Sequence, residues 1–115
     1  MEIKYVKEPN SLACGQAVLS MITGEDVFTV INKVGTDRET DLKQMREYLL
    51  GKGFQMGERR AVTEKEELPN LAVLSLETPR CWHWSLYFGG VFFDPEHGVL
   101  LNFPESKRRY YFEVK

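Results

Sequence analysis

The spacing of apolar residues changes near Gly51 and Gly53, and this change constrains the fold more than any other feature of the chain. Before it, apolar residues recur every three or four positions, as on one face of a helix. After it, they form short alternating or continuous runs, which are typical of strands. Helices followed by strands indicate an α+β domain. A chain of 115 residues is about one domain's worth, so we expect a single domain over residues 1–115.

The first half predicts one short strand and three helices. Ile3 and Tyr5 alternate with Lys4, which favours a strand at 3–7. Apolar stripes and terminal glycines such as Gly24 and Gly35 then delimit the helices. We expect these helices at 11–23, 25–34 and 40–50.

The second half predicts an antiparallel sheet. The run at 71–76 is almost continuously apolar between Pro69 and Pro79, as expected for an interior strand. Gly89 and Gly90 suit a two-residue hairpin turn. We expect the other strands at 81–88, 91–94, 98–103 and 110–114.

Cys14 is the residue with the clearest chemical implication. The expected helix places its sulfur in the opening turn. Unpaired backbone N–H groups and the positive end of the helix dipole favour a thiolate there, which is the nucleophilic form of cysteine. A buried, inert helix cysteine is the alternative interpretation, because free cysteine is commonly buried.

The hairpin brings a histidine and an aspartate onto one face of the sheet. If Phe88 pairs with Val91 across the turn, the register continues to Ser85 opposite Asp94. Because side chains alternate faces, His83 and Ser85 then share a face with Asp94, with Cβ atoms of His83 and Asp94 roughly 6–8 Å apart. The other face is expected to be the apolar one, with Trp82, Trp84, Leu86, Phe88, Val91 and Phe93.

Cys14, His83 and Asp94 thus occur in an order that can form a triad. Asp94 would orient His83 and stabilise its imidazolium form, and the second ring nitrogen would face the thiol. His83 as a buried core histidine, and Asp94 as a strand-ending turn residue before Pro95, are the plainer alternatives.

The chain resembles the papain-like double-glycine leader peptidases, small domains found at the front of bacteriocin-exporting ABC transporters, and their freestanding relatives. The matching pieces follow the same order along nearly the whole chain: Cys14-Gly15, Gly35-Thr36-Asp37, Thr40-Asp41-Leu42, Gly53-Phe54, His83-Trp84 and Asp94-Pro95.

The resemblance implies a papain-like fold with N-terminal helices packed on a C-terminal antiparallel sheet. It also implies a thiol hydrolase that acts on a peptide or protein substrate, with Cys14 as nucleophile, His83 as general base and acid, and Asp94 as the orienting group. No cofactor and no metal are expected.

One position departs from the family pattern. The family places a glutamine six residues before the cysteine to stabilise the oxyanion, and Glu8 stands there. An ionised carboxylate would destabilise a developing oxyanion. Three alternatives follow: Glu8 is protonated, Asn10 or Gln16 replaces it as donor, or the chain has lost peptidase activity.

Three functions therefore stay open at the sequence level. The first is cleavage of a peptide or related amide through an acyl-enzyme on Cys14. The second is a catalytically silent papain-like module that binds a peptide or protein. The third is acyl transfer or deamidation by the same triad.

Charge and composition argue against two other classes of protein, those that bind nucleic acid and those that span a membrane. The formal net charge is −2 and positive residues are not concentrated in excess, which argues against a nucleic-acid surface. No apolar run approaches the roughly 20 residues that span a bilayer. The N-terminus lacks a signal-peptide pattern, so a cytoplasmic protein is expected. The sequence does not indicate an oligomeric state.

The two cysteines are expected to be free thiols. A reducing compartment argues against a disulfide between Cys14 and Cys81. Together with His83 and His97 they offer four zinc-ligand side chains, but their spacing fits no common structural zinc pattern.

Overall fold

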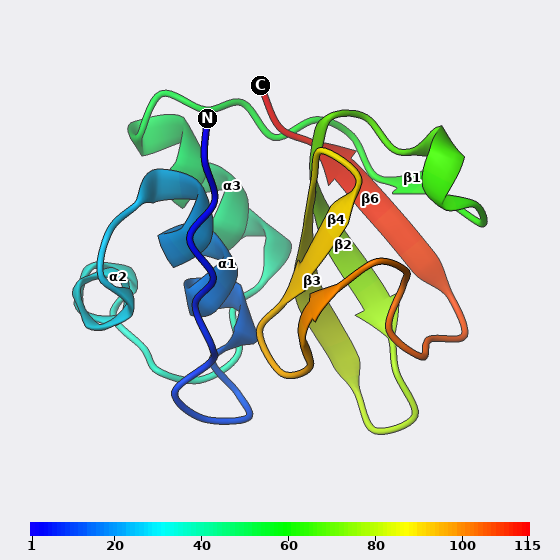
Figure 1. Cartoon of the computed structure of the whole chain (residues 1–115). Helices are drawn as coiled ribbons and strands as arrows, with labels where there is room; N and C mark the ends of the chain where they lie inside the picture. Colours follow the sequence, from blue (N-terminus) through cyan, green and yellow to red (C-terminus); the bar gives the residue numbers. More distant parts are fainter.

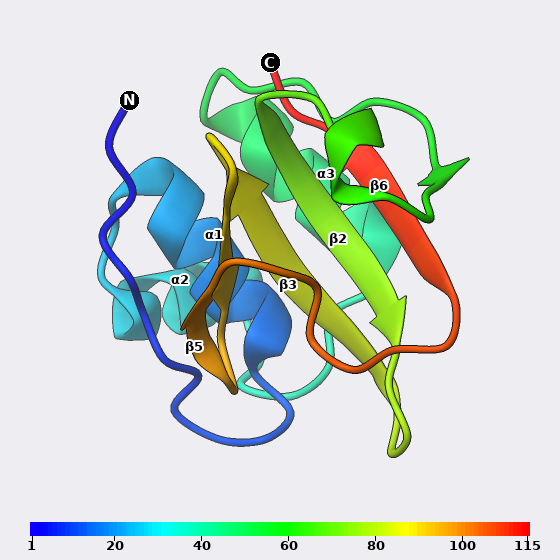
Figure 2. The ribbon, with the colours of Figure 1, turned by 45° about the vertical axis from the view of Figure 1, so that its right-hand side comes forward.

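The chain folds into a layer of helices packed on one side of a twisted sheet (Figure 1, Figure 2). The computed structural model describes residues 1–115. The three helices are α1 (Cys14–Thr23), α2 (Val27–Val34) and α3 (Leu42–Gly51), as the apolar spacing predicts. Both termini lie at the same end of the molecule (Figure 1).

The second layer is a six-stranded antiparallel sheet with the order β1-β6-β2-β3-β4-β5. β2 lies inside the sheet between β6 and β3, which explains its nearly continuous apolar run. The short β1 and the 3₁₀-helix η1 (Lys65–Glu67) were not predicted, because elements of two or three residues leave no periodic pattern. The strands are β1 (Arg60–Ala61), β2 (Leu71–Glu77), β3 (Trp82–Phe88), β4 (Val91–Asp94), β5 (Gly98–Leu100) and β6 (Arg109–Glu113).

The start of α1 differs from the prediction by three residues. The Asn10 side chain accepts a hydrogen bond from the Leu12 amide at 2.8 Å, and the Asn10 carbonyl accepts from Ala13 at 3.2 Å. These bonds form a turn in place of a first helical turn. The helix therefore begins at Cys14 itself.

The main core lies between the helices and the near face of the sheet. Gly24 ends α1 in the left-handed conformation with φ of 78°, so that α2 folds back beside it. The largest fully buried side chains of this core come from both layers: Val18, Leu19, Val30, Met45, Leu49, Val73, Leu86 and Phe112.

The far face of the sheet is also apolar, which corrects the expectation of one polar and one apolar face. Tyr87 and Phe92, on the same face as His83, are buried in a second cluster with Ala72, Leu74 and Leu76. Leu100 and Phe103 pack against this cluster. The hairpin pattern did not show this, because the covering residues come from loops.

Two predicted strands were wrong in extent. Residues 3–7 are extended but form no strand. Instead Ile3, Tyr5 and Val6 pack against the main core. β5 ends at Leu100, and residues 101–103 leave the sheet to cover its far face.

Candidate active site

Cys14 is held where the helix layer meets an uncovered stretch of β3. β4 pairs with β3 only from Leu86 to Phe88, so the edge of β3 on the β4 side is unpaired at Trp84, while β2 pairs with the other edge. The Trp84 amide donates a hydrogen bond to Cys14 Sγ at 3.4 Å. Cys14 is 8% exposed, so its sulfur is nearly buried at this junction.

Gly15 explains how the helix approaches so closely. A Cβ at this position would collide with Thr40 Oγ1 and would lie 3.1 Å from the Trp84 ring. The Trp84 indole also donates to the Thr40 carbonyl at 2.9 Å. The Cys14-Gly15 pair therefore lets the first turn of α1 pack directly against β3.

His83 and Asp94 meet as the hairpin register predicts. Phe88 pairs with Val91 across a turn in which Gly89 and Gly90 both have positive φ, as a type I′ turn requires. His83 Nε2 lies 3.1 Å from each carboxylate oxygen of Asp94. The side chains are 5% and 0% exposed, respectively.

Three further donors hold the Asp94 carboxylate. Ser85 Oγ donates to Oδ2 at 2.8 Å, and the amides of Glu96 and His97 donate to Oδ1 at 3.0 Å each. Asp94 is therefore both a partner of His83 and the cap of the turn that follows β4. The contacts of Asp94 agree with both interpretations from the sequence, the turn residue and the partner of His83.

The electrostatics favour a charged His83. Burial disfavours the imidazolium, but hydrogen bonds with Asp94 and Cys14 outweigh it and raise the pKa of His83 to about 10. Burial also opposes the Asp94 carboxylate, yet the hydrogen bond and charge of His83 lower the pKa of Asp94. Cys14, His83 and Asp94 thus form a chain of interacting groups with His83 in the middle.

Glu8 lies beside this chain with an unsatisfied side chain. Its amide donates to the Pro95 carbonyl at 3.0 Å, which ties the N-terminal segment to the turn after Asp94. The residue is 9% exposed, and its Oε1 is buried without a hydrogen-bond partner. Burial raises the pKa of Glu8, while the positive charge of His83 acts in the opposite direction.

Asn10 and Gln16 are engaged elsewhere. The Gln16 side-chain nitrogen donates to the carbonyls of Thr36 and Arg38, both at 2.8 Å, so both of its hydrogens are used. Asn10 Nδ2 donates to the Asp37 carbonyl at 3.1 Å. Both residues thus fix the loop after α2, and Glu8 is the candidate donor whose side chain is not committed.

Cys81 and His97 lie outside the chain of groups. Both cysteines are free thiols, as expected. Cys81 is exposed in a turn closed by Thr78. The His97 ring lies 6.4 Å from that of His83 and contacts Glu96 at 3.0 Å. No group of three or more His, Cys, Asp or Glu side chains is arranged to hold a metal ion.

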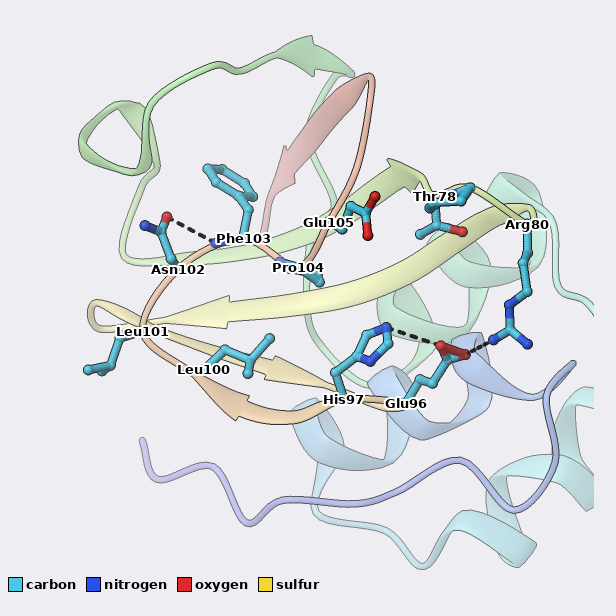
Figure 3. A pocket seen from close by; sticks show the side chains of 11 residues that line it. Thr78, Arg80, Glu96, His97, Leu100, Leu101, Asn102, Phe103, Pro104 and Glu105 are labelled. Carbon is cyan, nitrogen blue, oxygen red and sulfur yellow. Dashed lines mark hydrogen bonds and ion pairs between the residues drawn. The ribbon is translucent and has the colours of Figure 1, made fainter.

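A cavity of about 780 Å³ opens next to His97 on the far face of the sheet. Figure 3 shows the Arg80–Glu96–His97 contacts at one end and the loop from Leu101 to Glu105 at the other. Arg80 and Glu96 form an ion pair at 2.6 Å. The sequence did not reveal this cavity, because its walls come from three separate loops.

The comparisons with known proteins give a match at the level of structure. No protein-family model matches the sequence, and no curated protein matches it. Among solved structures, the chain is similar to a double glycine motif protease from an AMS/PCAT transporter, in complex with the leader peptide.

That similarity has a TM-score of 0.69 at 16% identity and covers 96% of this chain and 91% of the other. It supports the papain-like α+β fold expected from the motifs. At this identity it shows the fold alone. No helix of this structure has the length and apolar character needed to cross a membrane.

Proposed function

We propose that this chain is a papain-like thiol hydrolase that cleaves a peptide or related amide bond through an acyl-enzyme on Cys14. One observation carries the proposal: His83 is hydrogen-bonded to the buried carboxylate of Asp94 and interacts with Cys14, whose sulfur accepts a hydrogen bond from the next amide along β3. A nucleophile, a base and an orienting group in contact are the arrangement that acyl transfer requires.

The first half of the proposed reaction forms the acyl-enzyme. The Cys14 thiolate attacks the amide carbonyl carbon, forming a C–S bond, and the carbonyl oxygen becomes an oxyanion. His83, as imidazolium, gives its proton to the amine nitrogen as the C–N bond breaks. Asp94 keeps the imidazole oriented through Nε2, so Nδ1 is the nitrogen that transfers the proton.

The second half releases the acyl group. Neutral His83 takes a proton from water, the hydroxyl attacks the thioester carbonyl, and the C–S bond breaks to regenerate the thiolate. N–H groups in the first turn of α1 lack partners within the helix and are suited to stabilise the oxyanion. A protonated Glu8 would add a neutral donor, and its raised pKa supports that form.

A silent peptide-binding module is the second candidate, and Glu8 is the observation that favours it. An ionised Glu8 next to the carbonyl oxygen would oppose the first step. The nearby cavity of about 780 Å³ would still accommodate a side chain of a bound peptide. The third candidate, acyl transfer or deamidation, uses the same first step with a different acceptor or amide.

Incubation with synthetic peptides that contain paired small residues tests the proposal. The products are identified by mass spectrometry, with Cys14→Ala as the matched inactive protein. We expect cleavage by the wild type, no cleavage by Cys14→Ala, and a trapped thioester mass on Cys14 at early times. Peptide binding without turnover in either protein favours the silent module, and ammonia release without cleavage favours deamidation.

A further inference from the structure

Two aromatic rings lie between two guanidinium groups on the surface next to the candidate site. The Arg59 guanidinium lies 4.4 Å from the Tyr110 ring centre, Tyr110 lies 6.0 Å from Trp82, and Arg108 lies 5.5 Å from Trp82. We call these four residues the arginine–aromatic strip.

The strip continues the face of the sheet that the helices cover. Ser75 pairs with both Trp84 and Tyr110, so these two aromatic side chains share a face. Trp84 is held under the helix layer by Thr40. Trp82, two residues earlier on the same face, is 48% exposed. The strip thus begins where the helix layer ends.

The position of the strip connects it with the reacting groups. Trp82 directly precedes His83, and the amide of Trp84 contacts Cys14 Sγ. A peptide bound across Cys14 can therefore place one flank along the strip.

The charge of the strip indicates what it would bind. Arg108 is paired with Glu77 at 2.9 Å, but Arg59 makes no ion pair and is exposed. Trp, Tyr and Arg are also the residue types that contribute most to binding at interfaces. An exposed strip of these types with an unpaired guanidinium is suited to a carboxylate-bearing chain.

We propose that the arginine–aromatic strip binds an acidic segment on one flank of the peptide that Cys14 attacks, an inference that rests on the proposed function. The segment stacks its side chains on Trp82 and Tyr110 and presents a carboxylate to Arg59. Basic and aromatic residues together also suit single-stranded nucleic acid. The peptide is favoured because Trp82 of the strip precedes His83 in the strand whose Trp84 amide bonds Cys14 Sγ, and because the chain as a whole carries a net charge of −2.

Fluorescence anisotropy with two labelled peptides tests this binding. The peptides have the same length and apolar residues, and one carries glutamates where the other carries glutamines. The measurement uses the Cys14→Ser protein, so binding is read without turnover. We expect the glutamate peptide to bind more tightly at low salt, with the difference falling as salt rises.

Arg59→Gln should remove much of this preference, weakening the glutamate peptide roughly two- to fivefold and leaving the glutamine peptide nearly unchanged. Lys43→Gln on α3 is the matched control, because it removes one exposed charge that belongs neither to the strip nor to an ion pair. Equal binding of the two peptides, equal effects of Arg59→Gln and Lys43→Gln, or tighter binding of a single-stranded oligonucleotide would overturn the proposal. A protein that binds as expected but cleaves nothing would contradict the proposed hydrolase activity and leave the binding proposal intact.

Discussion

The two sides of Cys14 are built in different ways. On the sheet side, Asp94 receives hydrogen bonds from Ser85, two backbone amides and His83, so its carboxylate is fixed before any ligand arrives. On the N-terminal side, Glu8 is buried with one oxygen that has no partner.

The hydrogen bonds of Asp94 are therefore part of the fold itself, whereas the state of Glu8 depends on protonation or on a ligand. A carboxylate with several donors is held rigidly in its charged form. A buried carboxyl group with an unpaired oxygen is costly and is relieved by a proton or by a new partner. We therefore expect substitutions on the sheet side to remove function and stability, and substitutions at Glu8 to adjust the rate.

The largest effect is expected from His83→Ala. Turnover of a cleavable peptide should fall roughly 10⁴-fold, because proton transfer and the orientation of the thiolate are both lost. His97→Ala is the matched control, since the His97 side chain is nearby but 47% exposed, and the backbone amide that donates to Asp94 is kept in the variant. Similar losses in the two variants, measured as kcat/KM, would place the base elsewhere.

Asp94→Asn should lower the free energy of unfolding by about 3 kcal/mol, because it leaves His83 buried without its charged partner. Ser85→Ala removes only one hydrogen bond to the same carboxylate and should cost about 1 kcal/mol. Urea denaturation at neutral pH measures both. Equal losses in the two variants would mean that the His83–Asp94 pair adds nothing beyond an ordinary hydrogen bond.

The loss in unfolding free energy caused by Asp94→Asn should also depend on pH. The pKa of His83 is raised to about 10 in the folded protein from 6.5. Its charged form therefore contributes stability fully below about pH 6.5, and this contribution is lost as pH rises through about 10. The difference in unfolding free energy between wild type and Asp94→Asn should shrink over that range. A difference that stays constant would show that His83 is not charged in the folded state.

A gain in rate is expected from Glu8→Gln. If Glu8 lies near the oxyanion, the neutral amide should raise turnover at neutral pH by part of the 10²–10³-fold that one donor contributes, roughly tenfold. Wild-type activity should rise toward acid as Glu8 takes up a proton, whereas the activity of Glu8→Gln should lack that rise. Glu8→Ala removes the carboxylate without supplying a donor, so it is the control and should gain less than Glu8→Gln. An active enzyme that gains nothing from Glu8→Gln would have another oxyanion donor.

The sequence predicted the parts of this molecule that local pattern determines. The helix stripes, the interior strand at 71–76 and the Gly89-Gly90 turn fixed the main elements, and the hairpin register placed His83 beside Asp94. The expected α+β class follows from these elements. The start of α1 was misplaced because the turn at Asn10 competes with the helix.

The parts that depend on distant contacts were not predictable. The uncovered edge of β3, which lets Trp84 donate to Cys14, follows from where β4 ends. Gln16 was a candidate oxyanion donor by its distance from Cys14 in the sequence, but its contacts lie on the loop at Thr36 and Arg38. The far-face cavity and the arginine–aromatic strip combine residues from separate strands and loops, so no local motif marks them.

Alkylation of the two cysteines tests most directly whether Cys14 is an activated nucleophile. The native protein is treated with iodoacetamide at graded pH, and peptide mapping gives the rate at each thiol. At about pH 6 to 7 we expect Cys14 to react faster than Cys81, although Cys81 is exposed, because Cys14 lies at a helix N-terminus beside an imidazole, where reactive cysteines are found. His83→Ala should reduce this difference. Equal rates for the two thiols, or protection of Cys14 in the native protein, would contradict the assignment of Cys14 as nucleophile.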